Sequence, residues 1–138
     1  RSLVTLIALS MGSFAQAEDI LIVVHNDVDV EALPQETISE IYLGTRTKWE
    51  DGQTIRVAML KKGETHEQFT QDIVKTTPSK LKNLWKKVVF TGAGTPPKIF
   101  KDEDDLVEFV AETEGAIGYI DQKTPHEGVK TISILDAD

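Results

Sequence analysis

Segments with the apolar pattern of strands alternate with segments of helical periodicity along most of this 138-residue chain. Residues 20–24 (ILIVV) form a continuous apolar run, as expected of a strand that is covered on both faces. Further strands are predicted at residues 54–60, 99–100, 116–120 and 129–135, and most of them are separated by a helical pattern. This alternation predicts an α/β fold with a mainly parallel sheet flanked by helices.

The first two helices are predicted from their end signals. Pro34 is expected to open the first helix, and Gly44 fits the left-handed position that follows a helix. Thr65 to Gln68 matches a capping box, which places the start of the second helix at Thr65. The buried sides of the two helices are predicted to carry Ile38, Ile41 and Tyr42, and Phe69, Ile73 and Val74, respectively.

The third and fourth helices have clear amphipathic patterns. Thr77 and Pro78 fit the N-cap and the first position of the third helix, and Asp102 fits the N-cap of the fourth. Apolar residues at helical spacing predict one buried stripe on each, formed by Leu81, Leu84, Trp85, Val88 and Val89, and by Leu106, Val107, Phe109 and Val110. We therefore expect Trp85 to be buried against the sheet.

Composition excludes several classes of protein. Fifteen basic and 23 acidic residues give a net charge of −8, and no basic stripe occurs, so nucleic acid is not an expected partner. Cysteine is absent, and the three histidines are scattered, so neither a thiol nucleophile nor a metal site is predicted. No serine-hydrolase or nucleotide-binding motif is present. We therefore expect no cofactor and no enzymatic activity.

The N-terminal segment has the pattern of an export signal. Residues 3–9 (LVTLIAL) are apolar and too few to span a bilayer, and Ala15-Gln16-Ala17 matches a cleavage site. We predict a signal peptide over residues 1–17, truncated at its start, followed by a single domain over residues 18–138 in the periplasm. The alternative is a buried N-terminal helix. Without cysteine, no lipid anchor is expected.

Small residues follow the third predicted helix. Thr91, Gly92, Ala93, Gly94 and Thr95 precede two prolines, through which no helix can continue. Backbone N–H groups and hydroxyls in such a loop can approach a small anion closely. The loop can equally be a plain connector after a buried helix, and both interpretations remain open here.

Several motifs in order resemble those of the periplasmic phosphate-binding proteins, the solute-binding components of phosphate ABC transporters. Residues 41–44 (IYLG) with Trp49 and Asp51-Gly52 resemble the family signature IFLGK…W.DG. Thr65 with Phe69-Thr70 is similar to its SGT…FT segment. Residues 90–92 (FTG) and 115–120 (GAIGYI) are similar to its closing elements. The likeness covers most of residues 20–135 and implies a small, single-lobe branch of that family.

The resemblance implies a binding site for phosphate or a related small oxyanion. Gly63, Glu64 and Thr65 stand where the family has Ser-Gly-Thr, and no arginine occupies the position near Met59. Asn26 follows the first strand, at an edge where α/β sheets bind ligands. The predicted ligand-binding residues are Asn26, Gly63, Thr65, His66, Thr91, Gly92, Gly94 and Thr95.

Partners also follow from the resemblance. An inner-membrane ABC permease or a sensor is the implied protein partner, and a homodimer is left open. One lobe would leave a bound anion half exposed, so weak binding is expected. The alternative, supported by Glu64 and by the missing arginine, is a periplasmic interaction or regulatory protein that kept the fold without tight ligand binding.

Overall fold

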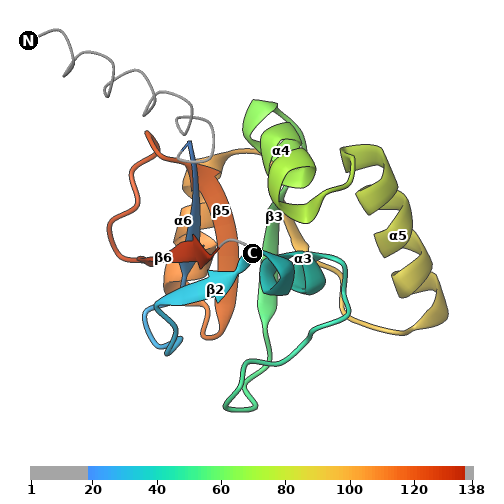
Figure 1. The fold of residues 1–138 in the computed structure, drawn as a ribbon, viewed down its shortest axis with the longest axis horizontal. Helices are drawn as coiled ribbons and strands as arrows, with labels where there is room; N and C mark the ends of the chain where they lie inside the picture. The colour runs from blue at the N-terminus through green and yellow to red at the C-terminus, as the bar shows by residue number, and fades with distance from the viewer. Residues whose placement is uncertain (1–18, 136–138) are drawn as a thin grey trace, which may run out of the picture.

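A six-stranded sheet forms the centre of the computed structural model, which describes residues 19–135. The strand order is β2-β6-β1-β5-β3-β4 (Figure 1). The predicted signal peptide, residues 1–17, lies outside the described residues. The strands are β1 (Ile20–Val24), β2 (Ala32–Pro34), β3 (Arg56–Leu60), β4 (Lys98–Phe100), β5 (Ala116–Asp121) and β6 (Lys130–Leu135).

One strand runs against the other five. β1 pairs antiparallel with β5 and with β6, whereas β2 with β6, β3 with β4 and β3 with β5 are parallel pairs. The sheet is therefore mixed but mainly parallel, which confirms the predicted architecture. Because β1 is reversed, its carboxyl end lies at the opposite edge of the sheet from the carboxyl end of β3.

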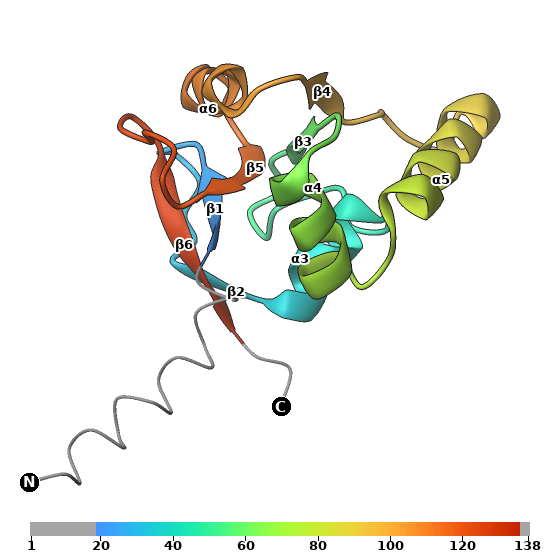
Figure 2. The ribbon, with the colours of Figure 1, turned by 90° about the horizontal axis from the view of Figure 1, so that it is seen from above.

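Helices cover both faces of the sheet (Figure 2). α6 (Glu103–Glu112) lies on one face, and α3 (Gln35–Tyr42), α4 (Glu64–Phe69) and the π-helical turn η2 (Thr70–Val74) lie on the other. Neighbouring residues of β5 show this division, since side chains alternate along a strand. A Cβ on Gly118 would lie 2.6 Å from Leu106 of α6. The ring of Tyr119 stacks on Phe69 of α4, with centroids 3.7 Å apart.

Two of the predicted helix caps are confirmed and one is wrong. The Thr77 side chain accepts a hydrogen bond from the Lys80 N–H (3.1 Å), and Asp102 accepts one from the Asp105 N–H (3.0 Å). The capping box at Thr65 is wrong, because the N-cap of α4 is Gly63, two residues before Thr65, and the helix begins at Glu64. Gly63 has φ +111°, a conformation that favours glycine, and it offers no side chain to cap the helix.

The edge strand β2 has no counterpart among the predicted strands. It has only three residues, and its last, Pro34, is also the N-cap of α3 rather than its first residue. Proline is tolerated there because an edge strand needs hydrogen bonds on one side only. A strand of three residues that ends in proline lacks the apolar run of a central strand, so β2 cannot be recognised from the sequence.

Helix α5 (Pro78–Thr91) stands apart from the sheet, beside β3 and β4 (Figure 2). Trp85 is buried as predicted, but its ring lies against Gly44 and its indole N–H donates to the Tyr42 carbonyl (2.8 Å), so it packs at the end of α3 and not against the face of the sheet. The stripe is not covered along its whole length, however. Val89 is 49% exposed, so its predicted burial is wrong, and the adjacent Phe90 is 91% exposed. None of the helices in the described part of the chain has the length and apolar character to cross a membrane.

Candidate functional site

The end of the connection from β3 to α4 and the first turn of that helix carry three of the predicted binding residues: Gly63, Thr65 and His66. β3 ends at Leu60, and the loop is held to β4 by the Lys61 N–H, which donates to the Phe100 carbonyl (2.8 Å). α4 then starts without a side-chain cap, so the N–H groups of its first turn have no intrahelical acceptor. This end of α4 is a local concentration of donors at the carboxyl edge of the parallel strands.

The Thr65 hydroxyl is not used in capping. Thr65 lies in the first turn of α4, after the N-cap, and its half-buried side chain has no hydrogen-bond partner among residues 19–135. The interpretation in which this hydroxyl caps the Gln68 N–H is therefore wrong. The hydroxyl remains available to a ligand beside the free N–H groups of the same turn.

His66 is held by a buried hydrogen-bonded chain. The Leu60 N–H donates to the Tyr119 hydroxyl oxygen (2.9 Å), and that hydroxyl lies 2.5 Å from His66 Nδ1. Burial raises the pKa of Tyr119 above its ordinary value, so the hydroxyl keeps its proton, and the available acceptor is Nδ1. Nδ1 then accepts, and the imidazole carries its proton on Nε2. Burial also lowers the pKa of His66, which favours this neutral form.

Charges of both signs lie around the start of α4. Lys61, Lys62 and Glu64 are all exposed, and none of them forms an ion pair within the described ranges. Glu64 would repel an anion, and the two lysines would attract it, with both effects weakened by water and salt. Thus the donors that are partly shielded from water belong to Thr65 and His66.

Asn26 lies far from these residues in the fold. It follows β1, and its side-chain amide donates to the Gly128 carbonyl (3.1 Å). Because β1 runs against β3, the carboxyl ends of the two strands lie at opposite edges of the sheet. The expectation that Asn26 shares an edge with Thr65 is wrong, since it treats β1 as parallel to its neighbours.

The loop after α5 is also separated from the start of α4. The Thr91 hydroxyl donates to the Val88 carbonyl (3.1 Å), and the Gly92 N–H donates to another carbonyl in the last turn of α5. Gly92 itself adopts the left-handed conformation typical of a helix end (φ +73°). Gly94 and Thr95 follow in the same loop, at the end of α5 that lies furthest from α4 (Figure 1). These contacts favour the connector interpretation of the loop.

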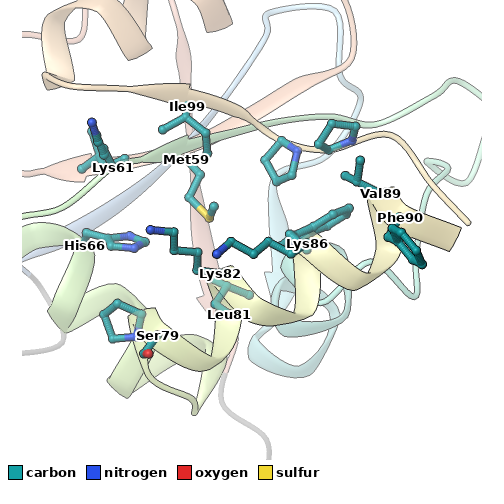
Figure 3. A pocket seen from close by; sticks show the side chains of 15 residues that line it. Met59, Lys61, His66, Ser79, Leu81, Lys82, Lys86, Val89, Phe90 and Ile99 are labelled. Carbon is teal, nitrogen blue, oxygen red and sulfur yellow. The ribbon is translucent and has the colours of Figure 1, made fainter. Parts of the chain in front are cut away.

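A groove of about 780 Å³ lies between α5 and the edge formed by β3 and β4 (Figure 3). Its lining is mostly apolar, and it begins at His66 and Lys61 beside the start of α4. Lys82 and Lys86 extend from α5 in the direction of His66 (Figure 3). Neither lysine was predicted from the sequence, although their spacing of four residues places them on one helix face. Tyr119 was not predicted either, because in sequence it is indistinguishable from other residues of a buried strand.

The described residues contain no group of three or more histidine and acidic side chains placed to hold a metal ion. Separately, the uncapped start of α4 and the oriented ring of His66 are suited to hydrogen bonding to an anion. The free N–H groups in the first turn of α4, the Thr65 hydroxyl and His66 Nε2 are the donors that this short segment offers.

Comparison with known proteins identifies relatives of this chain. A family model for the PBP superfamily domain matches residues 15–133. No curated protein matches the chain significantly. Among solved structures, a Clostridium perfringens protein assigned as a phosphate ABC transporter substrate-binding protein, with bound phosphate, matches 84% of this chain with a TM-score of 0.67 and 22% identity.

Two further structures match with the same coverage of this chain. An ABC-type phosphate transport receptor from Vibrio cholerae has a TM-score of 0.61 and 17% identity, and PstS from Borrelia burgdorferi has a TM-score of 0.64 and 11% identity. This chain spans less than half of each of the three structures, 44%, 46% and 47%. The first of these relatives is described as a substrate-binding protein and the second as a transport receptor.

Proposed function

This chain belongs to the PBP superfamily, and on that premise we propose that it binds phosphate or a related small oxyanion as the solute-binding component of an ABC transporter. The observation that carries the proposal is the unused, half-buried Thr65 hydroxyl in the first turn of α4. The bound phosphate in the Clostridium perfringens structure supports the choice of ligand.

Binding would use hydrogen bonds and the helix dipole. The anion would accept hydrogen bonds from the first N–H groups of α4 and from the Thr65 hydroxyl. The Tyr119 hydroxyl fixes the ring of His66, so that Nε2–H serves as a further oriented donor. Gly63 has no side chain, so the backbone there can approach the anion closely, and glycine readily adopts its φ of +111°.

The affinity would be low. Gly63 and Glu64 are exposed, so the anion would keep contacts with water, and the Glu64 carboxylate would repel it. We expect a dissociation constant on the order of millimolar, equivalent to about −4 kcal/mol. A second copy of the chain or a partner protein that covers the site would exclude water and tighten binding.

Calorimetry with inorganic phosphate on the verified monomer tests this proposal. Thr65→Val should abolish binding, because it replaces the hydroxyl with a methyl group at similar volume. Glu64→Gly should improve binding by removing the repulsion. Thr131→Val is the matched control, since Thr131 is an exposed residue of β6, outside the site, and binding should be unchanged. If the Thr65→Val variant bound phosphate with the wild-type affinity, the anion would have to bind elsewhere on the protein.

The second candidate function is a periplasmic interaction or regulatory protein that keeps the fold. The exposed Glu64 carboxylate at the start of α4 favours it, because this negative charge would repel an anion bound there. The two functions differ in a simple measurement. A solute-binding component changes its melting temperature with millimolar phosphate, sulfate or another oxyanion, whereas an interaction protein does not.

We also propose that residues 1–17 direct export to the periplasm and are then removed. The apolar run at residues 3–9 and the Ala15-Gln16-Ala17 pattern support this proposal. Mass spectrometry of exported protein should show a mature chain that begins near Glu18. Retention of residues 1–17 on periplasmic protein would contradict it. An inner-membrane permease or sensor would be the protein partner there.

A further inference from the structure

The groove between α5 and the β3–β4 edge combines an apolar lining with a cationic rim. We propose that it binds a monomeric organic anion with an apolar tail, of the class of alkyl phosphates and long-chain carboxylates. The groove shares His66 and Lys61 with the surroundings of the oxyanion site, but its apolar part lies beyond that site. The inference therefore goes beyond the binding of a small inorganic anion.

The apolar surface of the molecule is concentrated in this groove. Three of the four large apolar side chains that are exposed in the described part of the chain line it: Val89, Phe90 and Ile99. Met59, Trp85 and three prolines (Pro78, Pro96 and Pro97) extend the apolar lining. Contiguous apolar surface of this kind marks a binding site more often than isolated exposed residues do. A hydrocarbon tail would remove this surface from water.

The charges around the groove select the head of the ligand. Lys61, Lys82 and Lys86 line it, no aspartate or glutamate does, and none of these lysines has an ion-pair partner among residues 19–135. This is a local excess of positive charge on a chain whose net charge is −8. Figure 3 shows Lys82 and Lys86 extending from α5 in the direction of His66, so the anionic head belongs at that end.

The size of the groove favours a small molecule over a folded partner. Its volume of about 780 Å³ falls within the range of roughly 300–1,000 Å³ typical of small-molecule sites. The tail would then lie along α5, past Trp85 toward Val89 and Phe90. The neutral His66 would donate from Nε2 to the head, in addition to the attraction of the lysines.

Calorimetry with defined amphiphiles tests the inference, at concentrations below those at which micelles form. Decyl phosphate should bind at least about tenfold more tightly than decyltrimethylammonium, because only the anion matches the lysines. Octyl phosphate should bind about tenfold more weakly than decyl phosphate, because two methylene groups fewer are buried. Equal affinity for the anion and the cation, or binding only to micelles or anionic vesicles, would overturn the proposal.

Charge-reversed variants locate the site. The double variant Lys82→Glu and Lys86→Glu should weaken decyl phosphate binding by about tenfold or more. Lys80→Glu and Lys87→Glu form the matched control, because these exposed lysines lie on the same helix, do not line the groove, and change the net charge equally. The control should retain affinity within about twofold, since distant charges are screened. Equal losses in both variants would show that only the overall charge matters.

The result is separable from the proposed oxyanion site. Thr65→Val should abolish phosphate binding and leave decyl phosphate binding within about twofold, since Thr65 does not line the groove. Failure of phosphate to bind, with decyl phosphate bound, would therefore refute the proposed function and leave this inference standing. If the protein bound phosphate but not decyl phosphate, the inference about the groove would be refuted and the proposed function would stand.

Discussion

Helix α6 lies across β5, β3 and β1, whereas helix α5 stands beside the β3–β4 edge of the same sheet (Figure 2). Both helices carry an apolar stripe. On α6, Leu106 and Val110 are fully buried, and Gly118 of β5 lets the helix approach closely. On α5, Val89 is half exposed and Phe90 is almost fully exposed.

The two helices have similar amphipathic patterns but different surroundings. A stripe of apolar residues indicates that one face of a helix is suited to burial, but it does not indicate which element or ligand buries that face. The sheet covers the stripe of α6. Leu81 and Trp85 anchor α5, whereas Val89 and Phe90 near the end of the helix line an open groove. The stripe of α6 therefore contributes to folding, and part of the stripe of α5 is free for binding.

The largest expected effect separates the two stripes directly. Leu106→Ala should lower the free energy of unfolding by about 2–5 kcal/mol, because it opens a cavity beneath α6. Val89→Ala, a truncation on the other stripe, should change it by less than about 0.5 kcal/mol, because much of that side chain is already in water. Urea unfolding of both variants measures the two values. Similar losses would mean that α5 is as tightly packed as α6.

The next effect concerns the anchor of α5. Trp85→Phe keeps an aromatic ring but removes the N–H donor, leaving the Tyr42 carbonyl without this partner at a cost of about 1–2 kcal/mol. We expect the loss to appear mainly as faster amide hydrogen exchange in α5. Trp49→Phe is the matched control, because the Trp49 indole donates to the Gly115 carbonyl (3.0 Å) beside the sheet. That variant should leave exchange in α5 unchanged, and faster exchange there would contradict a local anchor.

Much of the fold follows from the sequence, and the reasons are physical. Buried central strands such as β5 consist largely of continuous apolar runs, and N-caps such as Asp102 form their hydrogen bond within one helical turn, so both leave a local signal. The reversed direction of β1 leaves no local signal. An apolar run looks the same in either direction, so the misplacement of Asn26 could not be recognised before the strand pairing was known.

The candidate site was predictable only in part. Gly63, Thr65 and His66 are close in sequence, and a resemblance in one short motif was enough to select them. The contribution of Tyr119 could not be foreseen, because its hydroxyl reaches His66 from a strand 53 residues away. Lys82 and Lys86 line the groove only because α5 lies beside β3 and β4 in the fold. That position depends on the anchoring of Trp85 at the end of α3.

A smaller effect should appear on acidification. Burial holds the pKa of His66 below its ordinary value of 6.5, so the unfolded chain binds a proton more readily than the folded protein. The stability contributed by the neutral ring is present above about pH 6.5 and is lost as the pH falls through that value toward the folded pKa. We expect wild type to lose more stability than His66→Gln between pH 7.5 and 5.5 in urea unfolding. An equal loss in both would show that His66 is not the group that titrates.

The smallest expected effect belongs to the most exposed apolar side chain. Phe90 is 91% exposed at the end of α5 and lines the groove, so it makes little contact that folding could use. Phe90→Ser should therefore change the free energy of unfolding by less than about 0.5 kcal/mol. In the same variant, decyl phosphate binding should weaken, because the tail loses part of its apolar contact. A different outcome is that the stability of the wild type rises with protein concentration and that Phe90→Ser removes this dependence. A second copy of the chain would then be the partner that covers this helix face.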